Sequence, residues 1–195
     1  MKTEEIKEYL KTQKKETKNL VDEIDEEKIL EIIEEIESVS KKDGEIYTIG
    51  NGGSSSTAKH LAADLDKTAD QKVELDINAS SLVSNESLLT AWTNDEDWEE
   101  VYKGQLEGRI TEDDMLVAIS VHGGSDQWSG NLVKGLKYAN TQGATTVGLS
   151  GFDGGKFTEV CDKSIVVGKE STPLVESLHT MIHHMIVFGL RKRGL

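Results

Sequence analysis

Short strand-like runs alternate with helix-like segments along the chain after residue 44. The runs predict strands at 45–49, 73–77, 115–119, 145–149 and 164–167. The segments between and after them predict helices at about 54–66, 86–92, 97–106, 131–141 and 174–191. This alternation is typical of a parallel sheet with helices on both faces, joined by right-handed crossovers.

The first 43 residues follow a different pattern and are rich in Lys and Glu. Isoleucines recur there at helical spacing, at positions Ile24, Ile29, Ile32, Ile33 and Ile36. They predict an amphipathic helix within an N-terminal helical hairpin. Two interpretations stay open, because the apolar stripe can pack on the domain or form a contact between chains. No Pro- or Gly-rich linker divides the sequence, so we expect one domain over residues 1–195.

Composition and charge narrow the class of protein. A chain of 195 residues, 36% of them hydrophobic, suits one α/β domain with a substantial core. The formal net charge of −14 repels nucleic-acid phosphates, so we expect no nucleic-acid partner. No apolar run is long enough to span a membrane, and no membrane partner is expected. A single cysteine, Cys161, and a charged N-terminus without a signal-peptide stretch predict a cytoplasmic location.

Two loops rich in Gly and Ser follow predicted strands. The first reads Gly50-Asn51-Gly52-Gly53-Ser54-Ser55-Ser56, and the second reads Ser120-Val121-His122-Gly123-Gly124-Ser125. Glycine lets the backbone approach a ligand closely, and a helix N-terminus favours anions. Ligands of open α/β sheets bind outside the carboxyl ends of the strands, where both loops are expected. The loops therefore predict a pocket for a small, oxygen-rich anion. A plain tight turn with a Ser cap is the competing interpretation of the first loop.

Histidines and carboxylates gather on two of the predicted helices. His60 and Asp64 are four residues apart and share a helix face. The last helix carries Glu176, His179, His183 and His184. Nitrogen and oxygen ligands of this kind suit zinc, although exposed histidines on a surface helix remain the competing interpretation. Helical spacing alone aligns Glu176 with His183 better than with His184.

The motif IGNGGSSSTAKHLAADL resembles the signature of sugar-isomerase (SIS) domain proteins. The resemblance continues through WTND at 92–95, AISVHGGS at 118–125, LSGFDGGK at 149–156 and the terminal ESLHTMIHH. These later motifs are similar to those of bacterial phosphoheptose isomerases, and together they cover nearly the whole chain. The resemblance implies a homotetramer with a five-stranded parallel sheet. It also implies a phosphosugar substrate and the conversion of sedoheptulose 7-phosphate to a heptose 7-phosphate.

Matched position by position, the resemblance implies a set of site residues. A divalent metal, zinc in the family, is expected between the two helices, with the ligands His60, Asp64, Glu176 and His184. Asp64 would be the base that moves a proton between C1 and C2 through an enediol, and His184 would be its partner acid. Substrate contacts are expected at Asn51, Gly52, Gly53, Ser54, Asp95, Ser120, His122 and Ser125. Among these, Ser120 and Ser125 would hold the phosphate.

Several residues depart from the family's pattern. Asp64 is one methylene shorter than the family's Glu, and Glu176 replaces a neutral amide. The second loop is altered at Val121, His122 and Gly124, and residues 126–130 look like a short insertion. Two alternative functions therefore stay open. One is a non-catalytic SIS protein that binds sugar phosphates or acts as a scaffold, and the other is an isomerase of a different sugar.

Overall fold

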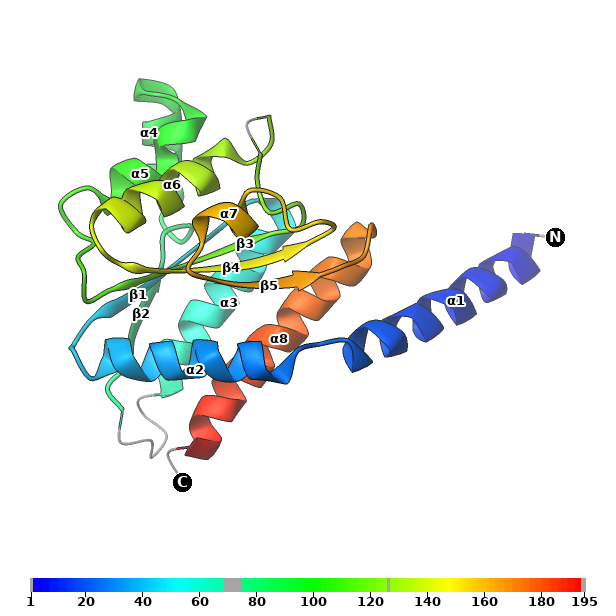
Figure 1. Cartoon of the computed structure of the whole chain (residues 1–195). Coiled ribbons are helices and arrows are strands. Elements are labelled where there is room, and N and C mark those ends of the chain that lie inside the picture. Colours follow the sequence, from blue (N-terminus) through cyan, green and yellow to red (C-terminus); the bar gives the residue numbers. More distant parts are fainter. Residues whose placement is uncertain (1, 69–74, 126, 194–195) are drawn as a thin grey trace.

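Five parallel strands form one sheet in the computed structural model, which describes residues 2–68, 75–125 and 127–193. The strand order is β2-β1-β3-β4-β5 (Figure 1). The strands are β1 (Glu45–Gly50), β2 (Asn78–Ser81), β3 (Met115–Ser120), β4 (Thr145–Gly151) and β5 (Lys163–Val167). The five-stranded parallel sheet expected from the resemblance is confirmed.

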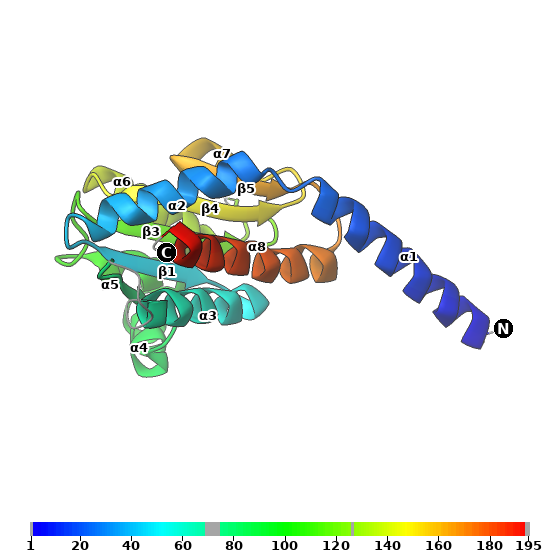
Figure 2. The same ribbon diagram turned by 90° about the horizontal axis from the view of Figure 1, so that it is seen from below.

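Helices cover both faces of the sheet (Figures 1 and 2). One face carries α2 (Glu26–Ser40), α3 (Gly52–Thr68) and α8 (Thr172–Arg193). The other carries α5 (Val101–Leu106), α6 (Gly130–Thr141) and α7 (Phe157–Val160). Helix α4 (Glu86–Asp95) and the 3-10 helix η1 (Trp98–Glu100) pack outside α5. The three-layer arrangement predicted from the alternating pattern is therefore confirmed.

The central strand shows why the sheet forms where it does. β3 reads Met-Leu-Val-Ala-Ile-Ser, and all six of its residues are buried. A strand with helices on both faces needs apolar side chains at successive positions, which this run supplies. The core continues into the helix layers through fully buried side chains such as Leu65 and Leu136. Burying one such side chain stabilises the fold by about 1.5–3 kcal/mol.

The second strand was placed wrongly by the sequence pattern. Residues 73 and 74 of the predicted strand 73–77 lie outside the described residues, and residues 75–77 are not in a strand. β2 begins at Asn78 and pairs with β1 from Glu45↔Asn78 to Thr48↔Ser81. β2 is an edge strand with one partner, and none of its four residues is fully buried. The short polar run Asn78–Ser81 can form this strand because an edge strand needs fewer apolar side chains. The alternating apolar and polar residues before it therefore did not mark the strand.

The N-terminal segment contains two helices with different surroundings. The isoleucine stripe is buried within the chain, with exposed fractions of 8% or less at Ile24, just before α2, and at Ile29, Ile32, Ile33 and Ile36 within α2. The stripe therefore packs on the domain, and the expected contact between chains stays a prediction. Helix α1 (Lys2–Asp22) extends away from the body instead of folding back along α2 (Figures 1 and 2). Within the described ranges, no helix combines the length and apolar character that a membrane span requires.

Candidate active site

Helices α3 and α8 run side by side in the same direction on one face of the sheet (Figure 2). The hydroxyls of Thr57 and Thr180 lie 3.5 Å apart. Further along, Arg191 Nε donates to Thr68 Oγ1 at 3.2 Å. This alignment brings the middle of α3 opposite the middle of α8, so residues distant in sequence meet there.

Three histidines converge on the carboxylate of Asp64. The Nε2 atoms of His183, His60 and His184 lie 2.9, 3.4 and 3.8 Å from Asp64 Oδ2. One potential ligand atom from each of the four residues lies within 4.8 Å of the others. Four ligand atoms at tetrahedral positions around one zinc ion are separated by about 3.3 Å, given bonds of about 2.0–2.1 Å. The spacing of this cluster therefore suits a small divalent metal.

The cluster has an open side and a buried side. The side chains of His60 and His184 are 50% and 42% exposed, and that of Asp64 is 24% exposed. The side chain of His183 is fully buried. Its ring packs against the other two, with centroids 4.5 Å from His60 and 4.2 Å from His184. His60, Asp64 and His184 are thus accessible to a ligand, and His183 lies behind them.

Electrostatics favour protonation states that bind metals. Burial alone would raise the pKa of Asp64, but the hydrogen bond with His183 and the three neighbouring imidazoles together hold it below its usual value. Burial lowers the pKa of His183, against the opposing effect of its hydrogen bond to Asp64. An ionised carboxylate and a neutral buried imidazole are therefore expected at neutral pH. Metal ligands require these deprotonated forms.

Glu176, which the resemblance implied as a ligand, lies outside this cluster. It precedes His183 by seven residues on α8, about 10 Å along the helix axis. Its carboxylate instead lies against the first turn of α3, where a Cβ added to Gly53 would be 2.3 Å from Glu176 Oε1. The structure therefore brings together three of the four expected ligands and adds His183 to them.

The side chain of Asn51 is held by two neighbouring helices. Its Nδ2 donates to Asn131 Oδ1 at 2.9 Å, and its Oδ1 accepts from Asn131 Nδ2 at 3.1 Å. The Tyr102 hydroxyl donates to the Gly50 carbonyl at 2.6 Å and lies 3.2 Å from Asn51 Oδ1. Asn51 therefore fixes the turn after β1. The sequence pattern did not indicate Tyr102 or Asn131, because neither belongs to a Gly/Ser motif.

Helix α3 begins earlier than its serines suggested. We expected it to start at Ser54, but its first residue is Gly52, which has a φ of +53° that suits glycine. Ser54 is buried, and the Ser55 hydroxyl donates to the Gly52 carbonyl at 2.7 Å. The hydroxyl of Ser55 therefore does not cap the helix N-terminus. Gly52 and Gly53 are exposed, which leaves the backbone of this first turn open to a ligand.

The loop after β3 is bound to the loop after β4. The carbonyls of Gly123 and Gly124 accept from the amides of Phe157 and Lys156 at 2.9 and 3.0 Å. Gly123 has a φ of +65°, and a Cβ there would lie 1.9 Å from the Gly154 carbonyl oxygen. Only glycine fits so close an approach. The loop after β4 therefore fixes the backbone conformation of the second Gly/Ser loop.

The polar side chains of the second loop differ in accessibility. His122 is exposed, and its ring lies 4.2 Å from that of Phe152 between centroids. Ser120 is buried at the end of β3. The Ser125 hydroxyl accepts from the amides of Gln127 and Trp128 at 3.2 and 3.0 Å, so it supports a local turn. Asp126, the first residue of the expected insertion, lies outside the described residues.

Asp95, the remaining expected substrate contact, is exposed at the end of α4. Its carboxylate accepts from Asn94 Nδ2 at 2.7 Å. Among the described residues, no hydrogen bond or ion pair joins Asp95 to either Gly/Ser loop. The fold of this chain alone therefore does not bring Asp95 into contact with the rest of the expected site.

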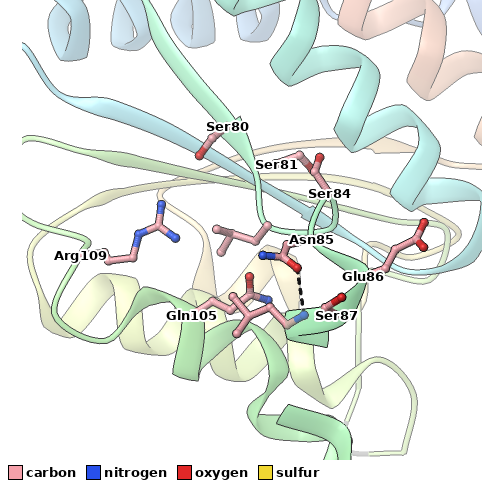
Figure 3. A pocket seen from close by; sticks show the side chains of 10 residues that line it. Ser80, Ser81, Ser84, Asn85, Glu86, Ser87, Gln105 and Arg109 are labelled. Carbon is pink, nitrogen blue, oxygen red and sulfur yellow. Dashed lines mark hydrogen bonds between the residues drawn. The ribbon is translucent and has the colours of Figure 1, made fainter. Parts of the chain in front are cut away.

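A separate pocket of about 580 Å³ lies between the end of β2, the start of α4 and α5 (Figure 3). Its polar lining includes Ser80, Ser81, Ser84, Asn85, Ser87, Gln105 and Arg109. The Asn85 side chain accepts from the Leu88 amide at 3.0 Å and caps α4, as the dashed line in Figure 3 marks. The Arg109 guanidinium lies over the Tyr47 ring, 5.2 Å from its centroid. This pocket contains none of the expected site residues.

Comparisons with known proteins agree with the fold. The SIS domain family model matches residues 8–151. Phosphoheptose isomerase of Aliarcobacter butzleri is 36% identical over 168 residues, which cover 82% of this chain and 86% of the relative. Lincomycin biosynthesis protein LmbN of Streptomyces lincolnensis is 40% identical over 149 residues, which cover 73% of this chain but 54% of that longer relative. The solved structure of phosphoheptose isomerase GmhA from Neisseria gonorrhoeae matches with a TM-score of 0.85 at 26% identity, covering 98% of this chain and 100% of that one.

Proposed function

Because the chain belongs to the SIS-domain family, in its phosphoheptose isomerase branch, we propose that it is an aldose–ketose isomerase of phosphosugars. The proposed reaction converts sedoheptulose 7-phosphate to a heptose 7-phosphate. The cluster of His60, Asp64 and His184 carries this proposal, because it combines an ionised carboxylate with two accessible imidazoles. A scaffold or a simple binding protein would not need such a group of acids and bases.

We propose that His60, Asp64 and His184 hold a divalent metal, most suitably zinc. Zinc in catalytic sites takes three protein ligands of the nitrogen and oxygen type and keeps one position open. The spacing and partial exposure of these three side chains fit that arrangement. When bound, the metal would polarise the sugar carbonyl and stabilise negative charge on its oxygen. Glu176 is left out of this ligand set because its carboxylate lies at Gly53.

The reaction requires one group that removes a proton from carbon and another that moves a proton on oxygen. Asp64 suits the first role, because its lowered pKa keeps it ionised at neutral pH. His184 suits the second role, because its imidazole is partly exposed beside Asp64, at 3.8 Å. A neutral imidazole carries both a donor N–H and an acceptor nitrogen, so it can take up a proton and pass one on. Together the two residues would transfer protons between C1, C2 and their oxygens.

We propose that the sugar phosphate lies between the cluster and the two Gly/Ser loops. The exposed backbone of Gly52 and Gly53 at the start of α3 suits hydroxyl or phosphate oxygens. Ser120, His122 and Ser125 remain the proposed phosphate contacts. His60 lies seven residues beyond Gly53, which is about 10 Å of helix. An extended seven-carbon sugar phosphate is long enough to bridge that distance.

Asn51, Ser54 and Asp95 have smaller or different parts in this proposal. The side chain of Asn51 positions the turn through Asn131, and Ser54 is buried. Asp95 is exposed on α4 and would reach the sugar only across a subunit contact or after a movement of α4.

We also propose a cytoplasmic homotetramer with α1 in the interface. Helix α1 exposes Ile6, Tyr9 and Leu10 at 58%, 56% and 53%. Apolar side chains on a helix that extends from the body favour association with another copy of the chain. The single Cys161 is consistent with a reducing compartment.

A conversion assay tests the proposed function. The zinc-loaded protein is incubated with sedoheptulose 7-phosphate, and the aldose is measured by chromatography. We expect a heptose 7-phosphate to form, to stop forming after chelation, and to form again when zinc is restored. His60→Ala should abolish conversion, whereas Lys67→Ala, an exposed control on the same helix, should retain it.

Two outcomes would favour the alternatives. Binding of sugar phosphates without conversion by any divalent-metal form would indicate a non-catalytic SIS protein. Conversion of a different ketose phosphate, with sedoheptulose 7-phosphate left unchanged, would indicate an isomerase of another sugar.

A further inference from the structure

We propose that His183 is a positioning residue that fixes the Asp64 carboxylate by donating its Nε2–H to Oδ2. In this role it supports the metal centre without being a ligand. The inference rests on the proposed metal site, and it assigns a function to a residue that the resemblance left out of that site.

His183 differs from the other two histidines in geometry and burial. Ordinary N–H···O hydrogen bonds span 2.7–3.2 Å between heavy atoms. The 2.9 Å separation of His183 Nε2 from Asp64 Oδ2 lies in this range, whereas His60 and His184 lie at 3.4 and 3.8 Å. His183 is also fully buried, while His60 and His184 are about half exposed. His183 therefore makes the structural contact, and the other two remain accessible to a ligand.

The second ring nitrogen of His183 indicates which nitrogen carries the proton. Nδ1 is buried and has no hydrogen-bond partner among the described residues. A neutral imidazole has one N–H and one acceptor nitrogen. A proton on Nδ1 would be a buried donor without an acceptor, whereas a proton on Nε2 finds the Asp64 carboxylate. The Nε2–H tautomer is therefore the favoured one.

This tautomer argues against direct metal binding by His183. A histidine that binds a metal almost always donates its other N–H to an acceptor. No such acceptor lies at His183 Nδ1 in the part of the chain that the structure describes. A carboxylate oxygen has two lone pairs, so Asp64 Oδ2 can accept from His183 and still bind a metal.

The short side chain of Asp64 explains why the hydrogen bond from His183 is needed. The resemblance implied a glutamate at this position, and aspartate is shorter by one methylene group. A shorter carboxylate must be held on the correct side of α3 to meet His60 and His184. His183 on α8 supplies that support, and partners of this type typically change metal affinity about 10–100-fold.

Two substitutions separate a donor from a ligand and from a packing residue. His183→Gln places an amide N–H near the position of the imidazole Nε2–H, while its amide nitrogen is a donor only and cannot replace an imidazole nitrogen as a ligand. His183→Leu keeps a buried side chain of similar size without a donor. Zinc affinity is measured by competition with a chelator, in the absence of sugar, with thermal melts as a control for folding. We expect about a 10–100-fold loss for His183→Leu and a near wild-type value for His183→Gln.

Two results would overturn the inference. Equal losses of zinc affinity in both variants would indicate that His183 is itself a metal ligand. Wild-type zinc affinity in both variants would indicate that His183 contributes packing only. Because sugar is absent, the result does not depend on whether the protein is an isomerase.

The wild-type protein provides a measurement that needs no substitution. ¹⁵N NMR of the metal-free protein should show the Nε2–H tautomer at His183. The Nδ1–H tautomer would contradict the inference, even if His183→Leu failed to fold.

Discussion

The imidazole of His183 lies 2.9 Å from the carboxylate of Asp64, although 119 residues separate them along the chain. The contact depends on the parallel course of α3 and α8. Helix α3 follows β1 directly, so its first turn lies at the carboxyl edge of the sheet, near the Gly/Ser loops. Asp64 lies about three turns further along the helix. A substrate held at that edge and extending along α3 would reach the cluster.

Substitution of Asp64 by Asn should abolish isomerisation and preserve the fold. Asparagine has nearly the same volume but cannot act as a base. Loss of a general base typically lowers the rate about 10²–10⁴-fold. Initial rates of aldose formation and a thermal melt would measure the two effects. Asp66→Asn, on the exposed face of the same helix, is the matched control, and full activity of Asp64→Asn would exclude Asp64 as the base.

Substitution of Glu176 by Gln should change sugar binding and leave metal affinity unchanged. The Glu176 carboxylate lies at Gly53 and not in the His/Asp cluster. We propose that sugar oxygens bind at this first turn of α3, and glutamine would present a donor there in place of one acceptor oxygen. Loss of one hydrogen bond by this exchange would raise KM about tenfold, the equivalent of ~1.4 kcal/mol. Zinc titration and steady-state kinetics would separate the two effects. A large loss of zinc affinity in Glu176→Gln would indicate that Glu176 is a metal ligand after all.

The sequence was most informative where apolar residues recur in a regular pattern within a segment. The apolar run of β3 and the isoleucine stripe of α2 both predicted their elements, because buried faces require regular spacing. The edge strand β2 was missed because an edge strand needs no apolar run.

The candidate site was predictable only in part. His60, Asp64 and His184 were expected together, and the structure places them together. The position of Glu176 and the burial of His183 depend on how α8 is rotated against α3. Spacing within one helix does not determine that rotation. It indicated that His183 could share a face with Glu176, but not that the carboxylate of Glu176 lies at Gly53.

The stability of the fold should decrease as pH falls below about 6.5, the ordinary pKa of histidine. His179 is 1% exposed, and burial lowers its pKa in the folded state. Below the unfolded pKa, the unfolded chain binds a proton that the folded chain does not, so the free energy of unfolding falls. The loss continues until the pH reaches the lowered pKa of the folded state. Above the unfolded pKa, His179 is neutral in both states and adds no pH dependence.

Urea unfolding at about pH 8 and about pH 5.5 would measure this effect, since these values bracket the unfolded pKa. His179→Leu should show a smaller decrease in the free energy of unfolding than the wild-type protein. An unchanged decrease in His179→Leu would mean that other groups cause the acid sensitivity.

Replacement of Ile6, Tyr9 and Leu10 together by Ser should reduce the oligomeric state. These side chains form the exposed apolar part of α1, and their burial between chains would stabilise association. Light scattering at micromolar concentration should show a tetramer for the wild-type protein and smaller species for the triple variant. The triple substitution Lys7→Ser, Lys11→Ser and Lys14→Ser on the same helix is the matched control. A wild-type monomer at that concentration would contradict the proposed assembly.

Proton NMR in D₂O tests the proposed isomerase most directly. An enediol is reprotonated on carbon by a group that exchanges protons with solvent. The zinc-loaded protein should therefore convert sedoheptulose 7-phosphate to an aldose that carries deuterium at C2, and Asp64→Asn should form none. If the wild-type protein binds the sugar phosphate but yields neither aldose nor deuterium exchange at C1, it is not an isomerase of this sugar.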